Sequence, residues 1–218
     1  MDREKLTFYQ IYYKDEQKEQ IYDFATPYLN QVLTPYFENS VIAGLVPDCK
    51  SDYVGVCSWR LKKKRGDMFR LQDKTLTREK ILNSDFDIAI LTPRSPTHNV
   101  MAMASHWHGA SWDNAIKDFR NFIKIPNIVK HAVYENHFIA RGDIYRDYVA
   151  NCLIPAMDYI STREVYFVDS GYIKRKSEVE RQILKNQLNR NDYPIAPFVL
   201  ERLFSIFISD KDYKVISL

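Results

Sequence analysis

Short apolar runs that alternate with amphipathic stretches are the feature that most constrains the fold of this chain. Three runs are typical of strands: LTFYQIYY at 6–13, DYVGVC at 52–57 and DFDIAIL at 85–91. Apolar residues at helical spacing predict helices at 111–123, 143–160 and 197–209. Since strands and helices alternate without separating, we expect an α/β fold, with residues 1–218 forming a single mixed-sheet domain flanked by helices.

Three further segments complete the expected order of elements. Residues 15–33 are mixed and polar and are expected to be helical, whereas VYFVD at 165–169 is expected to form a strand. The last residues, YKVISL, fit either an edge strand or a tail. A chain of this length buries enough apolar surface to fold without disulfides or structural metal.

The composition excludes two large classes of nucleotide-binding protein. The chain has 6 glycines, and neither GxGxxG nor GxxxxGK[ST] occurs. Dinucleotide and P-loop sites need those glycines, so neither is expected. The net charge of +3 is too small to indicate nucleic acid as a partner. The densest basic run, Lys62–Arg65, either attracts phosphate or forms a solvated loop.

The cysteines and the amino-terminal residues indicate where in the cell the protein is expected. Cys49, Cys57 and Cys152 are scattered and form no CxxC pair, which favours reduced thiols. The amino end, MDREKLTFYQ, lacks the basic-then-apolar pattern of a signal peptide. No apolar run approaches the ~20 residues needed to span a bilayer. We therefore expect a soluble, cytoplasmic protein.

All five histidines fall within one part of the chain: His98, His106, His108, His131 and His137. If residues 98–108 are helical, Gly109 ends the helix, and His106 and His108 point about 200° apart. They could then not bind one ion together, whereas in an extended segment they would share a side. A zinc site also needs a third ligand, and only distant candidates exist. Polar pocket groups and plain structural histidines are the other interpretations.

Asp85 and Asp87 stand two residues apart in DFD. In an extended chain both carboxylates face one side, which suits a divalent ion carrying a diphosphate. The pair precedes its apolar run, however, and ligands in open α/β sheets usually bind beyond the carboxyl ends of strands. Turn and strand-entry roles at the edge of the sheet are the alternative.

The segment GVCSWRLKKKRG places Ser58, Trp59 and Arg60 at the carboxyl end of the strand predicted at 52–57. That end of a strand is where a ligand would bind. The guanidinium of an arginine can form two parallel hydrogen bonds to a phosphate or a carboxylate. The alternative is a surface loop whose tryptophan packs on the core.

Several of these stretches together resemble a family of bacterial glycosyltransferase-like proteins, typically encoded among surface- and capsular-polysaccharide genes and long labelled a domain of unknown function. The similar segments occur in order over about residues 50–218: DYVGVCSWRLKKK, FDIAILTPR, SHWHGASWDNAI, ENHFIARGDIYRDYVANCLIPAM and FVLERLFSIFISDKDYKVISL. In the first segment, Gly55, Ser58, Trp59 and Arg60 occupy the positions of the family's Gly-Leu-x-His-Tyr-Arg-Arg pattern. One arginine is kept and the aromatic residue is changed.

The resemblance implies a GT-A-like fold, a nucleotide-sugar donor and a divalent ion, Mg²⁺ or Mn²⁺. We expect Arg60 to stabilise the diphosphate leaving group and Asp87, with Asp85, to hold the ion, since both act on charge that grows as the donor bond breaks. Glu201 or Glu135 is the expected general base of an inverting reaction, and a buried ion pair with Arg202 is the alternative role for Glu201. The residues expected to line the donor or acceptor pocket, in preference to holding zinc, are Ser58, Trp59, His106, His108, Asn136 and His137.

These features together predict a cytoplasmic glycosyltransferase that acts on a glycan acceptor in surface-polysaccharide synthesis. One alternative is a phage-type enzyme that glycosylates modified DNA bases, for which Lys62–Arg65 and Lys174–Lys176 would supply a basic groove. Another is a non-catalytic carbohydrate- or partner-binding protein with the same fold.

Overall fold

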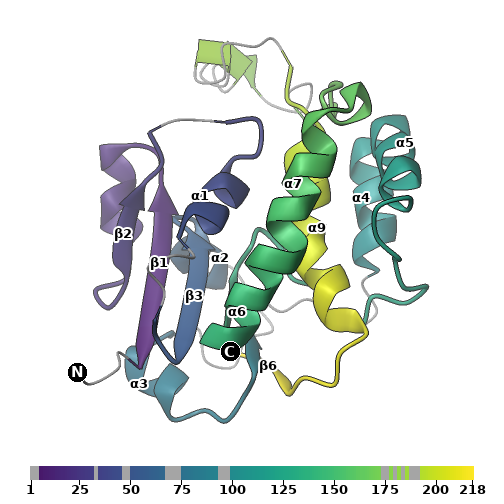
Figure 1. The fold of residues 1–218 in the computed structure, drawn as a ribbon. Coiled ribbons are helices and arrows are strands. Elements are labelled where there is room, and N and C mark those ends of the chain that lie inside the picture. Colours follow the sequence, from purple (N-terminus) through teal and green to yellow (C-terminus); the bar gives the residue numbers. More distant parts are fainter. Residues whose placement is uncertain are drawn as a thin grey trace.

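Six strands form one mixed sheet in the computed structural model, which describes residues 5–31, 34–45, 50–66, 75–92, 99–172, 177–178, 181–182, 185–186 and 192–218 (Figure 1). The strands are β1 (Leu6–Tyr12), β2 (Thr26–Leu29), β3 (Tyr53–Ser58), β4 (Ile88–Ile90), β5 (Phe138–Arg141) and β6 (Val215–Ser217). Their order across the sheet is β2-β1-β3-β5-β4-β6. Only the two pairs that contain β5 are antiparallel. The carboxyl ends of the other strands therefore meet the amino end of β5 at one edge, which we call the carboxyl edge.

The predicted α/β class, a mixed sheet flanked by helices, is confirmed. β1, β3 and β4 lie in the three apolar runs that predicted strands, and β6 is the expected edge strand. β2 and β5 were not predicted. That residues 1–218 make up one domain stays a prediction.

Two local predictions were wrong. The segment 15–33 begins with a 3₁₀ helix, η1 (Asp15–Gln20), and continues into β2 instead of forming a long helix. The segment 165–169 overlaps a short 3₁₀ helix, η4 (Glu164–Tyr166), and Asp169 makes only an isolated bridge to Pro194. β2 forms because its residues pair with β1, and 165–169 is a short segment whose conformation depends on its tertiary contacts.

Side chains that alternate along the strands divide the core between the two faces of the sheet. On β3, Val54 and Val56 join the larger apolar cluster, whereas Cys57 joins the smaller one. On β5, Phe138 belongs to the larger cluster and Ile139 to the smaller. Burial on both faces explains why the strand sequences are almost continuously apolar.

The three helices predicted at 111–123, 143–160 and 197–209 are present, together with others that the sequence pattern did not predict. They are α1 (Glu38–Gly44), α2 (Leu61–Gly66), α3 (Arg78–Leu82), α4 (Val100–His108), α5 (Ala110–Phe119), α6 (Gly142–Tyr148), α7 (Ile154–Ser161) and α9 (Ala196–Ser209). The predicted helix at 143–160 is α6, a π-helical turn η3 (Val149–Leu153) and α7, which run on as one rod in Figure 1. Pro155 lacks an N–H and would clash with a carbonyl one turn earlier, and the wider π turn before it accommodates this.

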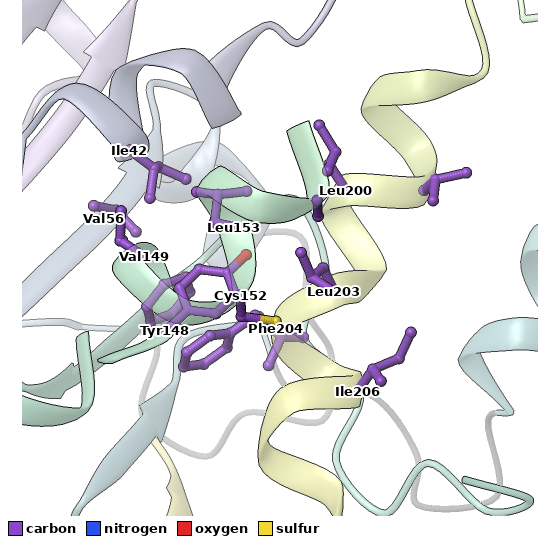
Figure 2. Close-up of a cluster of buried hydrophobic side chains, with 14 of the residues drawn as sticks. Ile42, Val56, Tyr148, Val149, Cys152, Leu153, Leu200, Leu203, Phe204 and Ile206 are labelled. Carbon is purple, nitrogen blue, oxygen red and sulfur yellow. The ribbon is translucent and has the colours of Figure 1, made fainter. Parts of the chain in front are cut away.

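The larger cluster fixes α9 against the rod and the sheet. Phe204 of α9 stacks on Phe138 of β5, with ring centroids 3.7 Å apart. Tyr148 meets Phe204 edge-on at 4.9 Å. Figure 2 shows Tyr148, Cys152 and Phe204 packed together between these elements. Because Glu201 lies one turn before Phe204, this packing also fixes the position of Glu201.

Two buried tyrosines of the rod give a matched test of this core. The Tyr145 hydroxyl donates to the Ile42 carbonyl at 3.0 Å, whereas that of Tyr148 is buried without a hydrogen-bond partner among the described residues. We expect Tyr145→Phe to lower the free energy of unfolding by about 1 kcal/mol, because the Ile42 carbonyl loses its donor. Tyr148→Phe is expected to leave it unchanged or raise it by about 1 kcal/mol, because an unsatisfied hydroxyl is removed. Urea denaturation of both variants measures the difference, and equal losses would contradict it.

The sequence also led to expectations about membrane spans and cysteines. In the parts that the structure describes, no helix is both long and apolar enough to cross a membrane. Cys57 and Cys152 are buried free thiols. Cys49, His98 and the basic run Lys174–Lys176 lie outside the described residues.

Candidate functional site

The carboxyl edge of the sheet gathers polar residues from separate parts of the chain. Val56 of β3 pairs with Phe138 of β5, so Ser58 lies opposite the turn that precedes β5. Helices α1 and α9 contact each other and reach the same turn through hydrogen bonds. We call these polar residues the strand-edge cluster: Glu38, Ser58, Arg60, Lys64, Glu135, Asn136, His137 and Glu201.

A buried serine–histidine pair lies at the centre of the cluster. Ser58 Oγ and His137 Nε2 are 2.9 Å apart, and both side chains are buried. The backbone N–H of Arg60 donates to the same Ser58 hydroxyl at 3.3 Å. Burial, with the charges of Lys64 and Arg60, lowers the pKa of His137 to about 3. The imidazole is therefore neutral at neutral pH, and it holds the Ser58 hydroxyl in position.

The turn before β5 has a strained backbone. Glu135 and Asn136 have φ angles of 57° and 56°, in the left-handed region that non-glycine residues rarely adopt. The Glu201 carboxylate accepts the backbone N–H of Glu135 at 2.7 Å, and the Asn136 amide donates to Asn39 Oδ1 at 3.3 Å. Strain of this kind persists where surrounding contacts enforce it, and it concentrates at functional sites. These contacts hold His137 against Ser58.

The two carboxylates that the sequence suggested as bases are both paired with cations. Glu135 forms an ion pair with Lys64 of α2, and its other oxygen lies 3.9 Å from His137 Nε2. Glu201 forms an ion pair with Arg202, as the alternative interpretation of the sequence expected. Since each carboxylate already has a cation and a structural contact, neither is well placed to accept a proton from a substrate.

Glu38 is a third carboxylate, which the sequence did not indicate. It is half-buried and, among the described carboxylates of the cluster, it alone makes no ion pair. Burial raises the pKa of Glu38 above its ordinary 4.5, while Tyr13 and the charge of Arg60 act against this shift. Groups whose pKa values are raised toward neutrality are the usual general acids and bases.

Aromatic rings enclose Glu38 and connect it to α4. Phe37, beside Glu38, stacks on Tyr193 with centroids 4.5 Å apart. Burial, together with the charge of Glu38, raises the pKa of Tyr193. Tyr193 lies 5.4 Å from Phe198, whose ring lies 4.0 Å from that of His108. His108 is thus joined to the cluster through an aromatic wall.

The two neighbouring histidines of α4 point in different directions, as a helix requires. His108 lies against Phe198, and its Nδ1 is 3.2 Å from the Ser170 carbonyl. His106 is exposed and contacts the Trp107 ring edge-on at 5.8 Å. The structure therefore brings His108 to the border of the cluster and leaves His106 outside it, and the pair does not share an ion.

Arg60 is the exposed cation of the cluster. It follows β3 directly, and its guanidinium lies 5.3 Å from the ring centroid of the partly buried Trp59. No acidic side chain among the described residues forms an ion pair with it. The guanidinium is therefore available to an anionic ligand.

The basic run Lys62–Arg65 is helical, and its last residue is buried. The Arg65 guanidinium donates to the carbonyls of Leu91, at 2.9 Å, and Leu218. These bonds fasten α2 to the ends of β4 and β6. Since Lys64 is paired with Glu135, only Lys62 and Lys63 of this run remain exposed.

Asp85 and Asp87 lie at the other end of the sheet. Asp87 precedes β4 and pairs with Arg141, the last residue of β5, at 3.0 Å, and Asp85 pairs with Lys214. Arg141 faces Tyr53 in the sheet, and the strand from Tyr53 to Ser58 is about 16 Å long. The structure therefore does not bring Asp87 and Arg60 into one cleft.

The divalent ion implied by the family resemblance finds no fitting donors in the described parts of the chain. Mg²⁺ and Mn²⁺ take several oxygen ligands. Asp85 and Asp87 are each neutralised by a basic side chain. Within the described ranges, no three His, Cys, Asp or Glu side chains are grouped as a metal site requires. Metal binding by the aspartate pair stays a prediction from the sequence.

Comparisons with known proteins bear on the fold. No protein-family model and no curated protein matches the chain. The apo structure of WbbM, a bifunctional glycosyltransferase, is similar to it, with a TM-score of 0.53 and 15% sequence identity. The likeness covers 98% of this chain but 44% of the WbbM chain, so this chain spans less than half of that protein. At this identity the likeness concerns the fold alone, and that fold is α/β and GT-A-like.

Proposed function

We propose that the chain is a glycosyltransferase that moves a sugar from a nucleotide-sugar donor to a glycan acceptor, in the synthesis of a surface polysaccharide. The likeness to a glycosyltransferase over 98% of the chain supports this. So does the position of the strand-edge cluster, since open α/β sheets bind ligands beyond the carboxyl ends of their strands. The observation that carries the proposal is Arg60, a cation that forms no ion pair with any residue in the described ranges and lies beside the buried Ser58–His137 pair.

Arg60 is suited to the leaving group of this reaction. When the bond between sugar and diphosphate breaks, negative charge grows on the phosphate oxygens. A positioned cation that meets this growing charge lowers the barrier. A guanidinium can donate two parallel N–H groups to phosphate oxygens, and that of Arg60 lies 5.3 Å from the ring centroid of Trp59. The Ser58 hydroxyl, bonded to His137 and to the backbone N–H of Arg60, is a neutral polar group beside it.

Glu38 is suited to the acceptor. A sugar hydroxyl that attacks the donor must lose its proton, and in an inverting reaction a protein base accepts it. No cation in the described part of the chain forms an ion pair with the Glu38 carboxylate, and burial raises its pKa, which makes it a stronger base than an exposed glutamate. The partly exposed rings of Tyr193 and Phe198, with Tyr193 backed by the buried Phe37, offer apolar surface to a sugar ring.

A glycan is better supported as the acceptor than DNA. A DNA-modifying enzyme would need a continuous basic groove. Arg65 is buried and Lys64 is paired with Glu135, which leaves Lys62 and Lys63 for such a groove. The second basic run, Lys174–Lys176, lies outside the described residues.

Turnover of a panel of UDP-, GDP-, ADP- and dTDP-sugars tests the proposal. We expect the release of nucleoside diphosphate from one donor class, and a rate about 100-fold lower in Arg60→Ala. Arg120→Ala, which removes an exposed arginine at the end of α5, is the matched control and should retain the rate. Sugar binding without any turnover would support the non-catalytic alternative. Salt-sensitive binding to duplex DNA would support the DNA-modifying one.

A further inference from the structure

We infer that a hollow at the carboxyl end of α7 is a second sugar-binding subsite, which holds a unit of the acceptor glycan further along the chain than the unit that reacts. The inference rests on the proposed function and adds to it the length of acceptor that the protein recognises. The hollow has a volume of about 440 Å³, within the range of about 300–1,000 Å³ that is typical of small-molecule sites. Its lining residues are Ser161, Thr162, Arg163, Glu164, Phe167 and Val168.

The lining combines apolar surface with polar groups that carry no net charge. Val168 is 43% exposed and Phe167 is partly exposed. The one guanidinium of the lining, that of Arg163, is balanced by the one carboxylate, that of Glu164, so a phosphate or other anion gains little there. A sugar is uncharged and has an apolar face beside its hydroxyls, and it therefore fits this lining.

The polar groups of the lining retain capacity for hydrogen bonds. The Ser161 hydroxyl donates to the Asp158 carbonyl at 2.7 Å, and the Thr162 hydroxyl accepts from Arg163 at 3.1 Å. A hydroxyl has one donor and two acceptor positions, so Ser161 can still accept and Thr162 can still donate. Glu164 is exposed and forms no ion pair with any described residue, so its carboxylate can accept hydrogen bonds from sugar hydroxyls.

Contacts with α5 fix the shape of the hollow. The Tyr166 hydroxyl donates to the Asp118 carboxylate at 2.7 Å, and the Tyr159 hydroxyl donates to the Asp118 carbonyl at 3.2 Å. The Arg163 guanidinium lies 3.6 Å from the ring centroid of Tyr159 and donates to the Tyr159 carbonyl at 2.7 Å. A site that already has its bound shape gives up less conformational entropy when a ligand binds. The few contacts that one sugar unit makes can therefore contribute to affinity.

The segment before α1 links the hollow to the proposed base. The Phe167 ring, which lines the hollow, lies 6.3 Å from the ring of Tyr36. Tyr36 stands two residues before Glu38, and Cα atoms two residues apart are separated by at most about 7 Å. Phe37, between them, has a φ angle of 51°, and backbone strain of this kind concentrates at functional sites. An acceptor whose reacting hydroxyl lies at Glu38 therefore has a short path past Tyr36 to the hollow.

A second link is the pairing of two backbone segments. The backbone N–H of Ile195 donates to the Val168 carbonyl at 3.1 Å, and that of Ser170 donates to the Tyr193 carbonyl at 2.8 Å. Val168 lines the hollow, and Tyr193 is one of the partly exposed rings offered to the reacting sugar. The hollow and those rings therefore belong to adjoining segments, as two subsites for one glycan chain require.

Isothermal titration with sugars of increasing length tests the inference. The ligands are homo-oligosaccharides of one to four units of glucose, galactose, mannose, rhamnose and N-acetylglucosamine. We expect at least one series to bind, with a dissociation constant that falls about tenfold or more between one unit and three, because a further unit reaches the hollow.

Two variants of the hollow and two matched controls assign that gain in affinity. Glu164→Gln leaves the core untouched and should weaken binding of the trisaccharide about tenfold, because hydrogen bonds to a charged group are lost. Phe167→Ala removes apolar surface and should weaken it by about the same factor. Both should leave binding of the monosaccharide unchanged. The controls are Glu79→Gln, at an exposed glutamate of α3, and Tyr213→Ala, at a partly buried ring beside the opposite edge of the sheet; neither should change binding.

The outcomes separate the inference from the proposed function. Sugar transfer to acceptors whose affinity does not depend on their length would overturn the inference and leave the glycosyltransferase proposal standing. A gain in affinity with length that both variants remove, without turnover of any nucleotide sugar, would support the subsite and count against the enzyme. A panel in which no oligosaccharide binds, or a gain that survives either variant, would overturn the inference.

Discussion

Glutamine in place of Glu38 is expected to lower the rate constant of sugar transfer by about 100- to 10,000-fold, which is the usual contribution of a general base. The glutamine amide keeps the size of the side chain but cannot accept the proton of the acceptor hydroxyl. Steady-state transfer with the donor identified by the sugar-nucleotide panel measures the effect. The binding of the donor should change little, because the amide leaves Arg60 in place.

The pH profile distinguishes a base from a merely structural carboxylate. Since burial raises the pKa of Glu38, the acidic limb of kcat/KM should lie above pH 4.5, the ordinary value for a glutamate. The limb should persist in Glu38→Asp and disappear in Glu38→Gln.

Glu201→Gln is the comparison, because the sequence analysis named Glu201, with Glu135, as a candidate base. We expect this variant to lose stability rather than the acidic limb, because it breaks the ion pair with Arg202 and weakens support for the strained turn at Glu135. Loss of the limb in Glu201→Gln alone would restore Glu201 as the base and exclude Glu38.

The elements that could be predicted are those whose signal is local. β3 and α9 carry their apolar pattern within one continuous segment, so period and length identify them. β5 has four residues, between a histidine and a glycine, and is a strand because β3 and β4 pair with it from both sides. Neither partner is adjacent to it in sequence. Pairing of this kind cannot be read from a single segment.

The residues of the candidate site also divide into those that a local sequence pattern identifies and those that it does not. Ser58 and Arg60 were identified because they follow a strongly predicted strand, and strand ends are where ligands bind. Asp87 was grouped with them by residue type, but it precedes β4, and the direction of β4 in the sheet places it at the opposite edge. Glu38 carries no motif at all. It reaches the cluster because α1 packs on α9, a contact between segments far apart in the chain.

Acid is expected to destabilise the protein through His137 more than through its other described histidines. The folded-state pKa is about 3, against 6.5 for an ordinary histidine, so the unfolded chain takes up this proton first as the pH falls. The stability that neutral His137 contributes is fully present above pH 6.5 and is lost as the pH falls toward 3. The loss is about 2 kcal/mol at pH 5 and about 4 kcal/mol at pH 3.

Urea denaturation of wild type and His137→Gln between pH 7.5 and 4.5 measures the pH-dependent contribution of His137 to the free energy of unfolding. Glutamine keeps a polar group beside Ser58 but does not titrate, so any packing loss is constant and only the slope against pH reports the imidazole. His131 is the matched control, because burial and Lys130 lower its pKa too, but its side chain is less buried. His131→Gln should therefore flatten the slope less than His137→Gln does. Parallel curves for wild type and His137→Gln would mean that the imidazole is solvated or charged in the folded protein, and the neutral Ser58–His137 pair would have to be abandoned.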